Sequence, residues 1–112
     1  MTRMRRCFAL DLADDPQLIA EYEARHRPGA VWPGVLAHLA AQGFRTMEIW
    51  RTGDRLVMVA DVAADVPRPV PTPPEVERWE AEMDRYQRRL PGSDGAKWLE
   101  MTRIFAWDDP AG

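Results

Sequence analysis

The stretch EYEARHRPGAVWP at residues 21–33 decides how the chain is organised, because a predicted helix ends here in a tyrosine and a histidine. Tyr22 and His26 are four residues apart, so they lie on one face of a helix and could touch the same small ligand. Pro28 and Gly29 follow and end the helix. The dipole at this helix end favours a protonated imidazole, and imidazole titrates close to working pH. His26 is therefore a candidate general acid or base.

The same spacing has a plainer interpretation. A tyrosine and a histidine on the inner face of an amphipathic helix are, in most proteins, core residues with one satisfied hydrogen bond. Trp79 also belongs to an apolar stripe, so its pattern favours the core, although its ring could form the wall of a ligand site. Spacing alone leaves both interpretations open for all three residues.

Apolar periodicity and turn residues predict strands and helices on both sides of this stretch. Asp15 and Pro16 begin a helix, Gly43 ends the next one, and a capping box at Thr72 and Glu75 begins the last. The predicted elements are a strand at 6–12, helices at 16–26 and 33–43, strands at 44–51 and 56–60 around a turn at 52–54, a proline-rich connector at 63–74, a helix from 75 to about 90, a loop at 91–95 and a strand at 97–106.

This order predicts an α+β fold of the ferredoxin-like sandwich type, with helices on one face of an antiparallel sheet. The chain then forms a single domain over residues 1–112. The run Leu56 to Ala60 is apolar without interruption, which is expected only where both faces of a sheet are covered. Because the helices can cover one face, a homodimer that packs two sheets face to face is expected.

Charge and cysteine content exclude several classes of partner. The net charge is −3, with acids and bases interspersed, so no basic stripe is available for nucleic acid or an anionic membrane. Cys7 is the only cysteine, and the charged start of the chain lacks an apolar signal segment, which predicts a reduced, cytoplasmic protein. The two histidines lack further ligands at metal spacing, so no metal site is expected.

Several motifs together resemble one known family. Tyr-x-x-x-His followed by Trp-Pro comes after a first strand that reads RRCFALDL (residues 5–12). The motifs MEIW (47–50), RWE (78–80) and RIF (103–105) follow in order. This pattern is similar to that of the L-rhamnose mutarotase family, small dimeric isomerases of the α/β-barrel type that interconvert the anomers of 6-deoxy sugars. The resemblance implies a monosaccharide substrate and no cofactor.

The resemblance also implies roles for individual residues. It makes His26 the proton donor, with Tyr22 and Trp79 in contact with the sugar. Met47 stands where the rhamnose enzymes carry a sugar-binding tyrosine, and Glu80 stands where they carry a second tryptophan. The motif that contains Glu48 and Trp50 resembles a branch associated with L-fucose, so we expect these four residues to bind substrate and L-fucose to be favoured over L-rhamnose.

The second proton-transfer group stays open at this point. Glu48, Glu80, Asp84 or a bound water could serve, and Glu48 is notable because a carboxylate on a mostly apolar strand is unusual. A salt bridge from Glu48 to Arg103 would explain it equally well. Two other classes of function also stay open, a monooxygenase of the same dimeric fold and a non-catalytic sugar- or partner-binding module.

Overall fold

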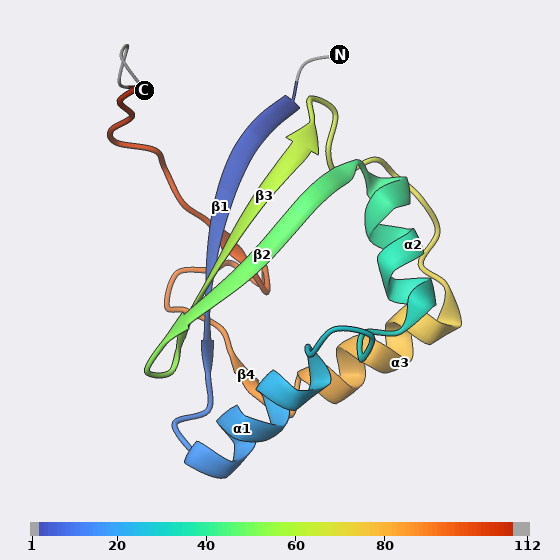
Figure 1. Cartoon of the computed structure of the whole chain (residues 1–112), viewed down its shortest axis with the longest axis vertical. Coiled ribbons are helices and arrows are strands. Elements are labelled where there is room, and N and C mark those ends of the chain that lie inside the picture. Colours follow the sequence, from blue (N-terminus) through green and yellow to red (C-terminus); the bar gives the residue numbers. More distant parts are fainter. Residues whose placement is uncertain (1–2, 109–112) are drawn as a thin grey trace.

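Three long antiparallel strands form the sheet of the computed structural model, which describes residues 3–108 (Figure 1). They are β2 (Phe44–Thr52), β3 (Arg55–Ala63) and β1 (Arg3–Leu12), with β3 in the middle. Two short strands, β4 (Gln87–Arg88) and β5 (Leu99–Glu100), both pair with β1. A β-bulge between Phe44 and Thr46 shifts the register at the start of β2. The sheet is thus a three-stranded antiparallel core with short strands added beside β1.

Three helices cover one side of this sheet (Figure 1). They are α1 (Pro16–Arg25), α2 (Pro33–Gln42) and α3 (Pro74–Met83). The Asp15 carboxylate caps α1 by accepting hydrogen bonds from the backbone N–H groups of Gln17 and Leu18, at 2.9 and 3.2 Å. Gly43 ends α2 in the left-handed conformation, with φ of 109°, which a side chain would resist.

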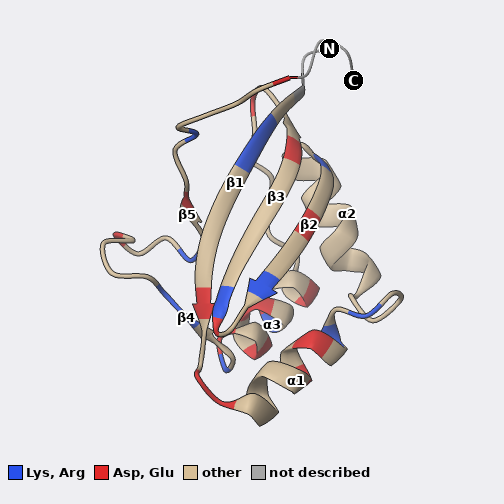
Figure 2. Ribbon diagram, turned by 60° about the vertical axis from the view of Figure 1, so that its left-hand side comes forward, with Lys and Arg blue, Asp and Glu red and all other residues tan. Residues whose placement is uncertain are grey.

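The two faces of the sheet differ in what covers them. The helix face carries alternate residues of the strands, and its central members are Leu10, Met47, Ile49, Leu56, Met58, Ala60 and Val62. The open face carries the residues between them, and its central members are Cys7, Ala9, Glu48, Trp50, Val57 and Val59. Figure 2 shows that the middle of β1 and β3 is free of charged residues, which gather toward the strand ends.

The core lies between the helix face and the helices. Its buried members are Leu12, Tyr22, Val35, Leu56, Val76, Trp79, Met83 and Tyr86. The predicted α+β fold, with an antiparallel sheet and helices on one face, is confirmed. Within residues 3–108, no helix is long and apolar enough to cross a membrane.

The predicted third helix is too long. Helix α3 ends at Met83 and not near Leu90, because residues 84–86 form a turn and Gln87 then pairs with Leu12 of β1. The predicted capping box at Thr72 is also wrong. The N-cap of α3 is Pro73, and no side chain caps this helix by a hydrogen bond.

The predicted last strand at 97–106 is also too long. Only Leu99–Glu100 is a strand, and the Met101 N–H still donates to the Cys7 carbonyl at 2.8 Å. Residues 102–108, here called the C-terminal arm, then leave the sheet (Figure 1). The sequence pattern of a strand is present, but pairing between β5 and β1 stops at Glu100 and Phe8, although β1 itself continues to Arg3.

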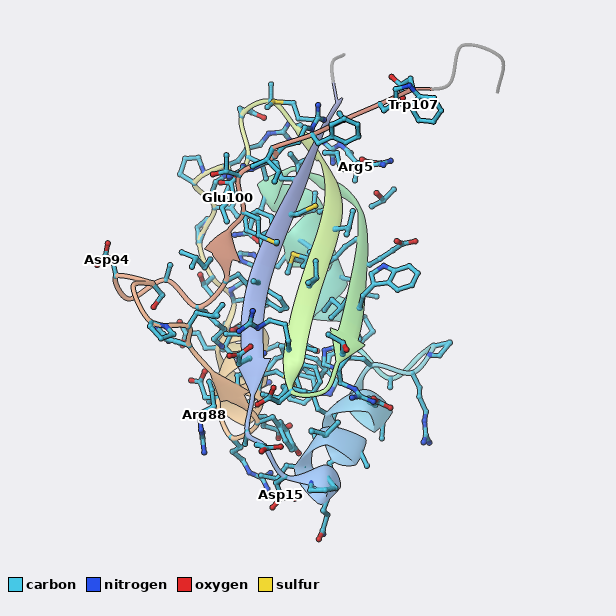
Figure 3. All side chains as sticks on the ribbon, turned by 90° about the vertical axis from the view of Figure 1, so that its left-hand side faces the viewer. Arg5, Asp15, Arg88, Asp94, Glu100 and Trp107 are labelled. Atoms are coloured by element: carbon cyan, nitrogen blue, oxygen red, sulfur yellow. The ribbon has the colours of Figure 1, made fainter. Side chains whose placement is uncertain are left out.

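The C-terminal arm exposes three large apolar side chains. The exposed fraction is 94% for Ile104, 78% for Phe105 and 69% for Trp107. Trp107 projects beyond the end of the sheet (Figure 3). Isolated apolar residues on a surface are ordinary, but three within one short segment are typical of a contact surface.

Candidate active site

A cavity of about 520 Å³ lies between the helices and the helix face of the sheet. This volume is within the range of about 300–1,000 Å³ that is common for small-molecule sites. Its walls come from every helix and from three strands. The lining residues are Tyr22, His26, Val31, Val35, Leu36, Leu39, Gln42, Phe44, Met47, Ile49, Met58, Pro67, Trp79, Glu80, Gln87 and Trp98.

His26 enters this cavity from the end of α1. Its backbone N–H donates to the Glu23 carbonyl at 3.0 Å, and its ring Nδ1 lies 2.8 Å from the carbonyl oxygen of Tyr22. A carbonyl oxygen can only accept, so Nδ1 carries the hydrogen and Nε2 keeps its lone pair. The bond also satisfies one of the carbonyls that the end of a helix leaves free. The result is an oriented imidazole with a basic nitrogen.

Burial sets the protonation state of this imidazole. The half-buried position lowers the pKa of His26 below its usual value, and the hydrogen bond to the Tyr22 carbonyl opposes this only in part. Burial thus acts against the protonated imidazole that the helix dipole favours. Loss of water around the ring disfavours the charged form of the imidazole. At neutral pH, His26 is a base.

Aromatic rings surround the imidazole. The ring centroid of His26 lies 4.3 Å from that of Tyr22 and 5.6 Å from that of Trp79. Trp79 in turn meets Trp32 edge to face, with centroids 5.1 Å apart. Only 4% of Trp79 is exposed, and it both belongs to the core and lines the cavity, so the two interpretations of this residue are compatible.

Polar groups lie on another part of the wall. The Tyr22 hydroxyl accepts a hydrogen bond from Gln87 Nε2 at 3.2 Å. Burial raises the pKa of Tyr22 to about 12, and the charge of the nearby Glu80 contributes in the same direction. Tyr22 is therefore a neutral hydrogen-bonding group at physiological pH.

Glu80 is held at the cavity by a lysine. Lys97 Nζ lies 2.5 Å from Glu80 Oε2 and 2.8 Å from Asp84 Oδ1. The Lys97 ammonium group is largely buried, while both carboxylates are about half exposed. The ion pair with this lysine therefore holds the Glu80 carboxylate on one side of the cavity. Asp84 does not line the cavity itself.

The structure does not bring all the expected site residues together. Met47 lines the cavity from β2, but Glu48 and Trp50 lie on the open face, because successive residues of a strand point to opposite sides. Glu48 Oε1 accepts a hydrogen bond from Trp50 Nε1 at 3.1 Å, and among residues 3–108 it forms no salt bridge to Arg103. His38, the other histidine, is half-buried on α2 and does not line the cavity.

Gln87 is a cavity residue that the sequence did not suggest. It falls within the segment predicted to be the end of the third helix, where a glutamine carries no particular signal. Only its pairing with Leu12 at the end of β1 brings it beside Tyr22, which lies 65 residues earlier in the chain.

An oriented base, an aromatic wall and a few convergent polar groups in a cavity of this size are the features of an acid–base enzyme for a small ligand. The family model described as L-rhamnose mutarotase matches residues 5–107. The chain therefore belongs to the L-rhamnose mutarotase family, which confirms the resemblance and makes it a sugar mutarotase of the L-fucose/L-rhamnose type, an isomerase.

Individual relatives agree with this assignment. An L-fucose mutarotase of Xanthomonas campestris pv. campestris is 47% identical over 112 residues, covering 95% of this chain and 90% of the relative. A UPF0734 protein of Dictyostelium discoideum is 30% identical over 112 residues, covering 89% and 86%. The crystal structure of an L-rhamnose mutarotase from Formosa agariphila matches with a TM-score of 0.68 at 18% identity, covering 94% of this chain and 99% of that one. This last likeness concerns the fold.

Proposed function

We propose that the physiological reaction is the interconversion of the α and β anomers of L-fucose, with His26 as the proton-transfer group. The observation that carries this proposal is the His26 Nε2 lone pair in a cavity of sugar size, beside the rings of Tyr22 and Trp79. The name of the 47% identical relative supports L-fucose over L-rhamnose. Membership of a mutarotase family argues against the monooxygenase alternative.

The chemistry that this site would perform is proton transfer. His26 Nε2 takes the proton from the anomeric hydroxyl, the bond between the anomeric carbon and the ring oxygen breaks, and the ring oxygen gains a proton from the imidazolium. The free aldehyde rotates, and the reverse steps close the ring on its other face. A neutral imidazole starts this sequence as a base, becomes an imidazolium, and can then act as the acid.

Four other side chains complete the proposed sugar site. Trp79 offers an aromatic face to the apolar C–H face of a deoxy sugar, and Tyr22 offers its hydroxyl. Met47 and Glu80 line the cavity at the positions where the rhamnose enzymes differ. Of the carboxylates considered as a second proton-transfer group, Glu80 is the one that lines the cavity, whereas we assign Glu48 and Trp50 to a subunit contact.

Saturation-transfer NMR on L-fucose and L-rhamnose tests the activity. The enzyme should speed exchange between the two anomeric proton signals, and more so for L-fucose. A protein that binds either sugar, seen as line broadening or a shift, without speeding exchange would be a binding module and would contradict the proposal.

The sugar preference should respond to a double substitution, Met47→Tyr with Glu80→Trp. Methionine cannot donate a hydrogen bond, and Glu80 is an acceptor held by Lys97. The double substitution therefore changes which donors and acceptors face the hydroxyl groups of the sugar ring. The ratio of kcat/KM for L-fucose to that for L-rhamnose should fall by about tenfold or more, as expected when a polar group is left unpaired. An unchanged ratio would contradict this account of specificity while leaving the activity intact.

We also propose a cytoplasmic homodimer in which two open faces pack together. Val57, Val59 and Cys7 form the apolar centre of this face, and Trp50, 63% exposed, lies beside them. The ion pairs Arg5–Asp61 and Arg55–Asp11 flank the centre at either end. An apolar centre with a charged border is typical of a subunit interface. The C-terminal arm supplies further apolar surface for the same contact.

Light scattering at micromolar concentration should give the mass of two chains. Val59→Lys should convert the protein to a monomer, because an ammonium group would be buried without a partner at the centre of the contact. Glu77→Lys, on the exposed side of α3, is the matched control and should stay dimeric. A wild-type monomer, or a dimer that survives Val59→Lys, would contradict the proposed interface.

A further inference from the structure

The pair formed by Tyr22 and Gln87 leaves two hydrogen-bonding groups unused. Gln87 Nε2 donates to the Tyr22 oxygen, so the proton of the Tyr22 hydroxyl is directed to another acceptor. Tyr22 is only 3% exposed, and both side chains line the cavity. A buried hydroxyl with its proton available is a donor that water reaches poorly.

The second unused group is the amide oxygen of Gln87. Gln87 Oε1 is buried and accepts no hydrogen bond from any residue in the described range 3–108. Buried polar atoms are nearly always paired, so an unpaired one next to a ligand cavity suggests that the ligand supplies the partner. A leucine or methionine of similar size would fill this place without an unpaired atom.

We infer that Tyr22 and Gln87 together bind one hydroxyl group of the sugar, which makes Gln87 a specificity-determining residue of the mutarotase. The Tyr22 hydroxyl donates to the oxygen of the sugar hydroxyl, and that hydroxyl donates its own proton to Gln87 Oε1. A sugar hydroxyl both accepts and donates, so it satisfies both groups at once. This inference rests on the proposed sugar-mutarotase activity.

The position of the pair fits this role. The rings of Tyr22 and His26 are 4.3 Å apart, so a hydroxyl held by Tyr22 belongs to the same sugar as the anomeric centre beside His26. Gln87 is fixed by its strand pairing with Leu12, a buried core residue, and not by a surface loop. A fixed acceptor rejects a sugar whose hydroxyl points elsewhere, because Gln87 Oε1 would then stay unpaired.

Gln87→Met is the direct test, with anomer exchange measured on L-fucose and on its singly deoxygenated analogues. The substitution keeps the length of the side chain and removes the acceptor. We expect KM for L-fucose to rise about tenfold or more, with kcat changed much less, because the lost bond holds the sugar and does not transfer a proton. One deoxy analogue, which lacks the bound hydroxyl, should bind the wild type weakly and be insensitive to the substitution.

Stability separates this role from a purely structural one. If Gln87 serves only to support Tyr22, Gln87→Met should lower the melting temperature and impair all sugars equally. If it binds a hydroxyl, the melting temperature of the sugar-free variant should stay close to that of the wild type, because removal of a buried unpaired oxygen offsets the lost hydrogen bond to Tyr22. Arg88→Met, on the next residue and exposed, is the matched control and should leave KM unchanged.

Tyr22→Phe provides the second variant. This substitution removes the hydroxyl that donates to the sugar, so KM for L-fucose should rise. For the deoxy analogue whose KM is insensitive to Gln87→Met, Tyr22→Phe should leave KM unchanged as well. The inference fails if the wild type and Gln87→Met have the same KM for L-fucose. It also fails if Gln87→Met raises KM by the same factor for L-fucose and for every deoxy analogue. A wild type that exchanges no sugar at all would instead overturn the proposed function, and the inference with it.

Discussion

Replacing His26 by alanine should lower kcat for anomer exchange by about 10²–10⁴-fold, the usual contribution of a positioned acid–base group. The fold should survive, because His26 is a half-buried side chain at the end of α1 and fills little of the core. Saturation-transfer NMR measures the rate, and circular dichroism checks the fold. His38→Ala is the matched control, since the other histidine does not line the cavity, and it should keep the wild-type rate.

The pH profile provides a second check on His26. Burial lowers the pKa of His26, so the basic form persists at neutral pH, and kcat/KM should fall only as the pH drops below the usual histidine value of about 6.5. His26→Ala should remove this limb of the profile. An alanine variant with wild-type exchange, or a wild-type rate that rises in acid, would contradict the assignment of His26 as the base.

Replacing Trp79 by alanine should destabilise the protein severely, by about 3–5 kcal/mol, the usual cost of deleting a buried aromatic ring. Such a loss is a large fraction of the total of about 5–15 kcal/mol that a small domain has. Trp79 is 4% exposed and joins α3 to the ring of His26 from α1 and to that of Trp32 just before α2. The variant should therefore lose both its packing and its cavity.

Urea unfolding followed by circular dichroism measures this loss. Arg78→Ala, on the exposed side of the same helix, is the matched control and should change the free energy of unfolding by less than about 0.5 kcal/mol. An equal unfolding midpoint for Trp79→Ala and the wild type would mean that the ring is not part of the core described above.

Local sequence patterns predicted the parts of the site that lie within one element. Tyr22 and His26 meet because helical geometry places residues four apart on one face, and Pro28 and Gly29 end the helix beside them. The order of strands and helices was equally readable, because apolar periodicity differs between the two. These features depend on neighbours along the chain.

The features that depend on distant neighbours could not be predicted. Gln87 lies in the cavity only because a two-residue strand pairs with the end of β1, and no periodicity signals so short a strand. The last strand was expected to reach residue 106 because its residues favour strands, but its pairing with β1 ends at Glu100. Glu48 could have been separated from Met47 by strand alternation alone, since adjacent residues face opposite sides.

The edge strand β2 affects how readily the protein associates at high concentration. β2 is the end strand, so within residues 3–108 the outer backbone groups have no strand beside them. An unpaired end strand can pair with further chains, most readily where it is flat and regular. Here the bulge between Phe44 and Thr46 interrupts this strand, and the charged side chains of Arg45 and Arg51 near its two ends make it a poor partner for a second β2. Loss of the bulge and of these charges, with the core left intact, is expected to favour pairing of β2 with a second chain.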